Sequence, residues 1–420
     1  MRASPTPVAA RALDHPGFRR YWTGLWCSTL AFWMLRVAVG WSAWETSRSA
    51  FGTGLVAALT MAPPALLAPL FGVVADRVRL AVAVPVVALS FAALAALLGA
   101  LSLADRLAFP TLAAIAALHG LVAAAWQPLR LTIPARLVPR ELLPETVSLS
   151  SMTFQVARVV GPAVAGIGIA RLGVASVYAA VALAYLGFLA LFLTVRLAPR
   201  ETDARDADPF LARFGAGLRV ALAMCEVRPT LAATLVGGIV ARGALELLPA
   251  VAGGRLDGGA TALAWLTSAA GLGAVAGGLV AARAPSDARS LARRFALTGA
   301  AGSVATLALG LVGGLPATAL ACAAIGLFAT LTGVSCQSLL QLTVADAYRG
   351  RVLSLWTTAG FGGAVLGTLV LGALGDRVGL ADALVGLGGT GALAFAAIAA
   401  LDRGRAPSGR SAEDATGRPP

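Results

Sequence analysis

Runs of about 20 apolar residues, separated by short polar breaks, make up most of this sequence. A run of this length crosses the hydrocarbon core of a bilayer as one helix, and a helix satisfies its own backbone hydrogen bonds there. The composition agrees, because 58% of the 420 residues are hydrophobic, 13% are charged and the mean hydropathy is +0.82. A water-soluble fold needs more charge to cover its surface. Water-soluble enzymes, secreted scaffolds and disordered proteins are therefore excluded.

Twelve such runs can be counted in the sequence. They predict an all-α membrane protein with twelve transmembrane helices. The runs cover residues 21–43, 52–74, 80–103, 108–129, 147–169, 173–195, 229–251, 259–281, 292–313, 315–337, 353–374 and 378–401.

One long polar stretch, 196–228, divides the runs into two sets of six. We interpret it as a cytoplasmic linker between an N-terminal six-helix bundle at 21–195 and a C-terminal six-helix bundle at 229–401. Cytoplasmic tails at 1–20 and 402–420 flank the two bundles.

All 33 basic residues are arginines, and they are unevenly distributed between the loops. If the N-terminus is cytoplasmic, the even-numbered loops and both tails hold most of them, which is the positive-inside pattern. Both termini are therefore predicted to be cytoplasmic. The net charge of +13 does not indicate nucleic-acid binding, because the arginines are scattered singly and not clustered with aromatic residues.

The two halves of the sequence repeat one another. Sliding the chain by about 206 residues places Gly72 on Gly278 and Arg36 on Arg242. Because six helices separate the copies, both halves enter the membrane from the same side and are related by an axis along the membrane normal. This is the arrangement of secondary transporters, whose substrate site lies between the halves near the membrane midplane.

A specific signature follows the second run. The segment Gly72-Val-Val-Ala-Asp76-Arg77-Val-Arg79 resembles the GxxxDRxxR motif of the major facilitator superfamily. The resemblance implies that Asp76 and Arg77 belong to a cytoplasmic charge network that stabilises one access state, which is a bistable gate. The plainer alternative is a solvated turn that obeys the positive-inside pattern.

The second half carries a degraded copy of this signature. Gly278 and Arg283 remain, and Ala282 replaces the aspartate. Residues 127–168 are similar to the exporter branch of the superfamily that includes enterobactin-type siderophore exporters and macrolide efflux proteins. The resemblance covers nearly the whole chain and implies the major facilitator fold.

The fifth run contains Gly161, Pro162 and Gly166. These residues are similar to the antiporter motif of proton-coupled exporters, although Ile167 stands where a final glycine pair would be completed. The glycines allow close helix approach and the proline bends the helix. Two interpretations of these three residues remain: a kink that serves helix packing only, and a role in gating.

Ionisable residues inside a membrane are costly, so each is a functional candidate. Five are embedded in the runs, and four of them fall on the first, fourth and seventh runs, which by resemblance to the superfamily line the central cavity together with the tenth. The five candidates for cavity charge or proton coupling are Arg36, His119, Arg158, Arg242 and Glu246.

Glu246 follows Arg242 by four residues, so the two can pair on one side of the seventh helix. Glu246 could instead bridge to Arg36, and in the plainest interpretation these charges only neutralise one another and fix packing. In the functional interpretation, surplus positive charge attracts an anionic or polyphenolic ligand and Glu246 exchanges a proton. His119 is the other proton-carrier candidate, or else a structural histidine.

Aromatic residues accompany these charges. Trp33, one turn before Arg36, and Trp126 with Gln127 are candidate substrate contacts, because indole rings bind flat cargo by stacking and cation–π contact. Tryptophan also anchors membrane interfaces, but Trp33 and Trp126 lie too deep in the predicted helices for that role.

The sequence therefore predicts a proton-coupled exporter of small organic molecules, such as siderophores, macrolides or other drug-like compounds, in the inner membrane of a bacterium. An importer or facilitator of an organic anion is the alternative, and a transport-inactive sensor or structural protein is a remote one.

We expect no enzymatic activity, because no catalytic cluster and no GxxxxGK[ST] loop occurs. No cofactor or metal is expected, since the four cysteines lack ligand spacing. The expected partners are a small-molecule substrate, protons and the lipid bilayer, with the chain a monomer.

Overall fold

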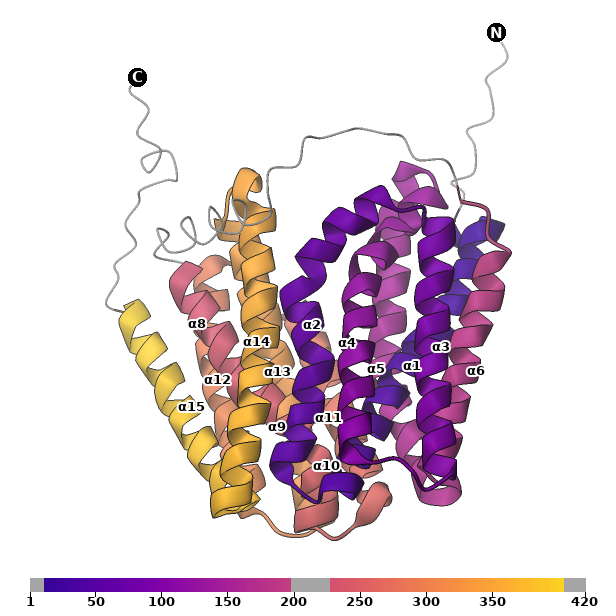
Figure 1. The fold of residues 1–420 in the computed structure, drawn as a ribbon. Helices are drawn as coiled ribbons and strands as arrows, with labels where there is room; N and C mark the ends of the chain where they lie inside the picture. Colours follow the sequence, from indigo (N-terminus) through magenta and orange to yellow (C-terminus); the bar gives the residue numbers. More distant parts are fainter. Residues whose placement is uncertain (1–10, 198–226, 404–420) are drawn as a thin grey trace, which may run out of the picture. The chain divides into compact units, whose positions relative to one another are not determined.

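The computed structural model describes residues 11–197 and 227–403, and all regular structure within them is helical (Figure 1). The predicted linker 196–228 and the tail 402–420 lie largely outside the described residues, as does the first half of the predicted tail 1–20, whose last residues, 16–20, begin α1. The first part contains α1 (Pro16–Ser47), α2 (Ala50–Arg77), α3 (Leu80–Leu103), α4 (Phe109–Thr132), α5 (Leu143–Leu172) and α6 (Val174–Leu193). The second contains α8 (Val227–Gly237), α9 (Gly243–Glu246), α10 (Leu248–Ala250), α11 (Gly259–Arg283), α12 (Ala288–Leu311), α13 (Leu315–Thr343), α14 (Asp346–Val378) and α15 (Leu380–Arg403).

Ten of the described helices are long and apolar enough to cross a membrane, and a bent pair in the second part makes an eleventh candidate. α1 is not among them, although its 32 residues are long enough. Its tryptophans and embedded arginine lower its mean hydropathy, because indole and guanidinium groups are polar in part or in whole. The all-helical prediction is confirmed.

Most predicted boundaries agree with the helices to within a few residues, and α3 spans 80–103 as expected. Glycines in the left-handed region end two helices at equivalent places in the repeat. Gly173 has φ of 81° after α5, and Gly379 has φ of 94° after α14. A side chain would be strained at such a φ, so glycine is the residue that stops the helix.

The seventh predicted run differs from a single uninterrupted helix. It is divided at Leu247, and the segments Val227–Glu246 and Leu248–Arg255 meet at a bend of 42°. Pro249 explains the break, because its ring lacks an N–H donor and clashes with the carbonyl four residues earlier. A π-helical turn, η4 (Gly238–Arg242), precedes the bend.

The helices form two compact units, each described by itself. Unit 1 contains α1, α3 to α6, α2 from Leu59 onward and the start of α11 through Ala264. Unit 2 contains the remaining described helices and the start of α2 through Ala58. Two helices, α2 and α11, therefore belong in part to each unit. The bundle boundaries inferred from the sequence stay predictions.

Within unit 2, glycines let α11 and α13 approach one another closely. A Cβ atom added at Gly273 would overlap the carbonyl of Ala323, and one added at Gly326 would overlap the carbonyl of Ala270. Small residues at such contacts are the usual basis of helix packing in membranes, where apolar burial alone does not drive association.

We expect Gly326→Ala to lower the free energy of unfolding by about 1–3 kcal/mol, because the added methyl group forces two backbones apart. Unfolding of the detergent-solubilised protein measures the change. The matched control is Gly386→Ala in α15, where no atom lies within 4 Å of an added Cβ. Equal stabilities for the two variants would contradict this account of the contact.

Candidate functional site

Trp33 is the centre of an aromatic and arginine cluster in unit 1. The guanidinium carbons of Arg36 and Arg158 each lie 5.8 Å from the centroid of its ring. Phe32 and Phe154 contact the same indole edge-on, with centroids 5.5 Å away. The ring thus brings a cation of α1 and a cation of α5 together, and cation–π attraction offsets part of their mutual repulsion.

A glycine of α5 makes room for this tryptophan. A Cβ added at Gly161 would lie 2.6 Å from the Cβ of Trp33, so α5 approaches α1 closely at this point. Gly166 lies equally close to Ala264, at the start of α11 and in the same unit. α5 continues as one helix through Pro162, and the predicted bend there stays a prediction.

Arg130 extends the cluster and was missed by sequence reasoning. Its guanidinium carbon lies 5.4 Å from the centroid of Phe154. The predicted fourth run ended at residue 129, but α4 continues to Thr132, so the arginine is part of the helix. Arg36 also donates from Nη2 to the Sδ atom of Met61, at 3.3 Å.

His119 is buried among aromatic rings and has only 8% of its surface exposed. Its ring stacks on Phe32 with centroids 6.4 Å apart and lies 5.1 Å from Phe91. Among the described residues, no group hydrogen-bonds its Nε2 atom. The aromatic surroundings favour packing, while the unpaired nitrogen leaves the proton-carrier hypothesis open.

Trp126 and Gln127 are half-buried in α4. The indole of Trp126 contacts Phe188 of α6 edge-on, with centroids 5.5 Å apart. This contact gives Trp126 a packing role within unit 1. Its role and that of Gln127 as substrate contacts stay predictions.

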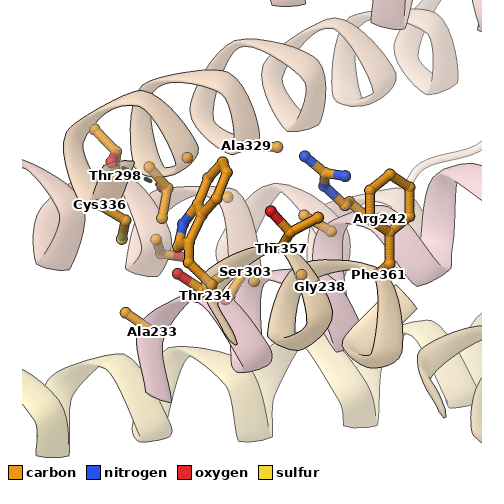
Figure 2. Close-up of a pocket in the computed structure, with 18 residues that line it drawn as sticks. Ala233, Thr234, Gly238, Arg242, Thr298, Ser303, Ala329, Cys336, Thr357 and Phe361 are labelled. Atoms are coloured by element: carbon orange, nitrogen blue, oxygen red, sulfur yellow. Dashed lines mark hydrogen bonds between the residues drawn. The ribbon is translucent and has the colours of Figure 1, made fainter. Parts of the chain in front are cut away.

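Unit 2 contains a pocket between α8, η4, α12, α13 and α14. Figure 2 shows Arg242 and Phe361 near one end of it and Thr298 and Cys336 near the other, with Thr357 between them. Its polar and aromatic lining residues are Thr234, Arg242, Thr298, Ser303, Thr332, Cys336, Trp356, Thr357 and Phe361. None of the described residues that line this pocket carries a carboxylate.

The lining of this pocket combines one arginine with five hydroxyl groups, and each hydroxyl donates to the carbonyl four residues earlier in its own helix. Arg242 is exposed to it, and its guanidinium carbon lies 5.8 Å from the centroid of Phe361. The indole N–H of Trp356 has no acceptor among the described residues. The hydroxyl groups of Thr298 and Thr332 hydrogen-bond one another at 2.9 Å across α12 and α13. The guanidinium of Arg242 suits a ligand that carries negative charge, and the hydroxyl oxygens can accept hydrogen bonds from that ligand.

Glycines create the space in this pocket. A Cβ added at Gly238 would lie 2.7 Å from the carbonyl oxygen of Gly360, so α14 contacts η4 closely there. At Gly333, also in the lining, an added Cβ would meet nothing within 4 Å. Arg242 is the last residue of the π-helical turn, and such turns occur frequently at functional sites.

Glu246 lies at the end of α9, four residues after Arg242 and just before the break in the helix. It is half-buried and is not among the residues that line the pocket. Sequence reasoning found Arg242 by its charge but missed the hydroxyl groups, because isolated serine and threonine residues are common in membrane helices.

The signature after the second run lies at the end of α2, which extends to Arg77. The side chains of Gly72, Asp76 and Arg77 lie outside those that the structure describes. Arg79 is exposed, as is Arg283, the counterpart of Arg77 in the second half, and an added Cβ at Gly278 would meet nothing within 4 Å. The gate therefore stays a prediction.

Solved structures with the same fold are transporters. A crystal structure of the nucleoside transporter NupG superposes with a TM-score of 0.70 at 12% identity, covering 92% of this chain and 98% of that one. The human organic anion transporter MFSD10 superposes with a TM-score of 0.62 at 15% identity, covering 90% and 98%. The helices and this likeness define the fold, which is that of a multi-pass helical membrane protein.

Residues 8–418 match the model of the transmembrane secretion effector family, and the chain belongs to that family. The enterobactin exporter EntS of Shigella flexneri is 29% identical over 372 residues, covering 86% of this chain and 85% of the relative. EntS of Escherichia coli O139:H28 (strain E24377A / ETEC) is 29% identical over 377 residues, covering 86% of each chain. The resemblance to the exporter branch is confirmed.

We expect Trp33→Leu to lower the free energy of unfolding by about 1–4 kcal/mol, because it removes two cation–π contacts. Trp265→Leu in α11 is the matched control, since that indole is 62% exposed, and it should change the value by less than about 0.5 kcal/mol. Chemical unfolding in detergent measures both. If Trp265→Leu lowers the free energy of unfolding as much as Trp33→Leu does, the stability loss cannot be attributed to the contacts of the Trp33 cluster.

Proposed function

We propose that the chain is an alternating-access exporter with twelve transmembrane helices in two six-helix bundles. The ten candidate spans and the bent pair support eleven crossings, and α1 is the twelfth in this proposal. The positive-inside pattern of the arginines supports cytoplasmic termini. The similarity to enterobactin exporters of enteric bacteria supports a place in the bacterial inner membrane.

The single observation that carries the cargo assignment is the pocket of unit 2, whose described lining residues include an arginine and no carboxylate. Arg242 supplies a positive charge and Phe361 an aromatic face. An anionic or polyphenolic organic molecule offers the acceptors and flat rings that match these groups. Siderophores, macrolides and other drug-like compounds are the candidate cargo classes. A cationic pocket can bind an anion whichever way that anion is transported. Import or facilitation of an organic anion is therefore the second candidate function.

Proton exchange is assigned to Glu246, with His119 as the second candidate. Glu246 is four residues from the pocket arginine and lies at a break in the helix. A carboxylate there can change its protonation as the broken helix moves, since a break is a place where a helix can bend. Inward proton movement would then drive cargo outward.

The cytoplasmic gate is assigned to the GxxxDR segment at the end of α2 and its degraded copy in α11. Asp76 and Arg77 supply the charges of the first copy, and Arg283 supplies that of the second. Charges at helix ends can bridge in one conformation and separate in the other.

Transport in reconstituted vesicles with an imposed proton gradient tests the cargo assignment. We expect an anionic dye, carboxyfluorescein, to move away from the cytoplasmic side, and Arg242→Ala to reduce its rate about tenfold through loss of one charge-assisted contact. A cationic dye, ethidium, should be affected little. Arg289→Ala, at an exposed site in α12, is the matched control.

A second variant tests the pocket itself. Gly333→Phe places a ring in open space within the lining, so it should block transport without lowering stability. Equal losses for both dyes with Arg242→Ala would refute selective anion attraction. Dye that accumulates on the cytoplasmic side would favour the importer, and no movement in any variant would favour the transport-inactive alternative.

Proton coupling is tested by Glu246→Gln, which preserves shape but cannot carry a proton at neutral pH. We expect gradient-driven dye movement to fall at least about tenfold, while dye exchange without a gradient persists. Glu45→Gln, at an exposed site in α1, is the control. His119→Phe, whose ring suits the space beside Phe32 and Phe91, identifies the carrier if Glu246→Gln leaves coupling intact.

A further inference from the structure

An aspartate at the end of α14 caps the start of α2. The Oδ1 atom of Asp376 accepts a hydrogen bond from the backbone N–H of Ala50 at 2.7 Å, and Oδ2 accepts one from that of Phe51 at 3.2 Å. The hydroxyl of Ser49 donates to the same Oδ2 at 2.5 Å. Ser49 and Asp376 are 327 positions apart in the sequence, and both belong to unit 2.

This cap is unusual because it comes from another helix. The first N–H groups of a helix have no partners within it, and they attract negative charge. Ordinarily a side chain just before the helix accepts hydrogen bonds from these N–H groups. The hydroxyl of Ser49 does so here, and it accepts a hydrogen bond from the N–H of Gly52 at 2.9 Å. Asp376 adds a full negative charge to this site and ties α14 to α2.

The surfaces beneath the cap have few side-chain atoms between them. A Cβ added at Gly372 would lie 2.8 Å from the carbonyl oxygen of Ala50, and one added at Gly54 would lie 2.5 Å from that of Thr368. Two smooth backbones in contact can separate without unlocking large side chains. The polar contacts of Asp376 are therefore well placed to decide whether the helices stay together.

The sequence around this aspartate has the spacing of the gate signature. Gly372-Ala-Leu-Gly-Asp376-Arg377 repeats the GxxxDR pattern that ends α2. The equivalent ends of α5 and α11 read Gly166-Ile-Gly-Ile-Ala-Arg171 and Gly278-Leu-Val-Ala-Ala-Arg283, with alanine at the acidic position. An aspartate is thus present at the ends of α2 and α14 and replaced at the other two.

The cap lies within unit 2, close to the point where α2 passes from one unit to the other. α2 belongs to unit 2 as far as Ala58 and to unit 1 from Leu59 onward. Its start is therefore the place where a helix of the first half is held by a helix of the second. The start of α2 and the end of α14 both adjoin odd-numbered loops. The positive-inside pattern assigns these loops to the side of the membrane opposite the termini.

We propose that Asp376 is a latch that stabilises the state closed on the side opposite the termini, and that its three contacts with the start of α2 break when this side opens. It is the counterpart of the GxxxDR gate proposed for the cytoplasmic side. The inference rests on the alternating-access part of the proposed function. A cap that persists in both states would be structural only, and the experiment separates the two.

Distances between spin labels test the latch in the full-length protein, reconstituted in lipid nanodiscs after replacement of the native cysteines. Labels at Arg106→Cys and Gly313→Cys report on the proposed latch side, and labels at Glu141→Cys and Ser286→Cys report on the other. All four sites are exposed and lie between the long helices, with Glu141 in the short 3-10 helix Arg140–Leu142. This readout needs no substrate, so it remains valid if transport itself is not detected.

We expect Asp376→Ala to raise the ratio of open to closed populations at the first label pair about tenfold, with the opposite change at the second pair. Ser49→Ala removes one of the three contacts of Asp376, together with the local cap of Gly52, and should raise the ratio about threefold. In the Asp376→Ala background, Ser49→Ala should add nothing, because the two act through one contact. Asp382→Ala, an equally exposed acid in the first turn of α15, is the matched control and should leave the distances unchanged.

Unchanged distances in Asp376→Ala, or an equal shift in Asp382→Ala, would overturn the latch. Size-exclusion profiles and melting temperatures of each variant identify any loss of folding. If Asp376→Ala does not fold, Ser49→Ala decides the question, since the carboxylate and its two backbone contacts remain. No shift in that variant counts against the proposal.

Discussion

The lack of water in the hydrocarbon core is the constraint on which the rest of this structure depends. Every backbone N–H and C=O group must find its partner within the protein, so the chain forms helices wherever it crosses. Lipid is as apolar as leucine, so the helices hold together through close approach. Gly161 beside Trp33 and Gly326 beside Ala270 are examples of that approach. The same scarcity of side chains leaves room for the pocket of unit 2.

Much of the fold follows from hydrophobic length alone. α3 and the starts of α11 and α13 lie where the apolar runs begin, because membrane thickness sets the length and glycine or a polar residue marks the end. The break at Leu247 was not foreseen, although Pro249 was visible in the sequence. A proline within a membrane helix can be tolerated or can divide it, and neighbouring helices decide which.

The candidate site was predictable where it depends on charge. Arg36, Arg158 and Arg242 stand out because a guanidinium in an apolar run is costly, and each has an aromatic ring beside it. Arg130 was not predicted, because a shift of a few residues at a helix end decides whether a residue counts as loop. The cap by Asp376 was not predicted either, since no local pattern joins residues 327 positions apart.

The open space at Gly333 bears on how this family changes its chemistry over time. The pocket can be made narrower at that position by any side chain, with no backbone contact disturbed. Gly238, in the same lining, has no such freedom because the α14 backbone lies against it. The lining can therefore vary at Gly333 to exclude or admit new compounds, while Gly238 keeps the helices assembled.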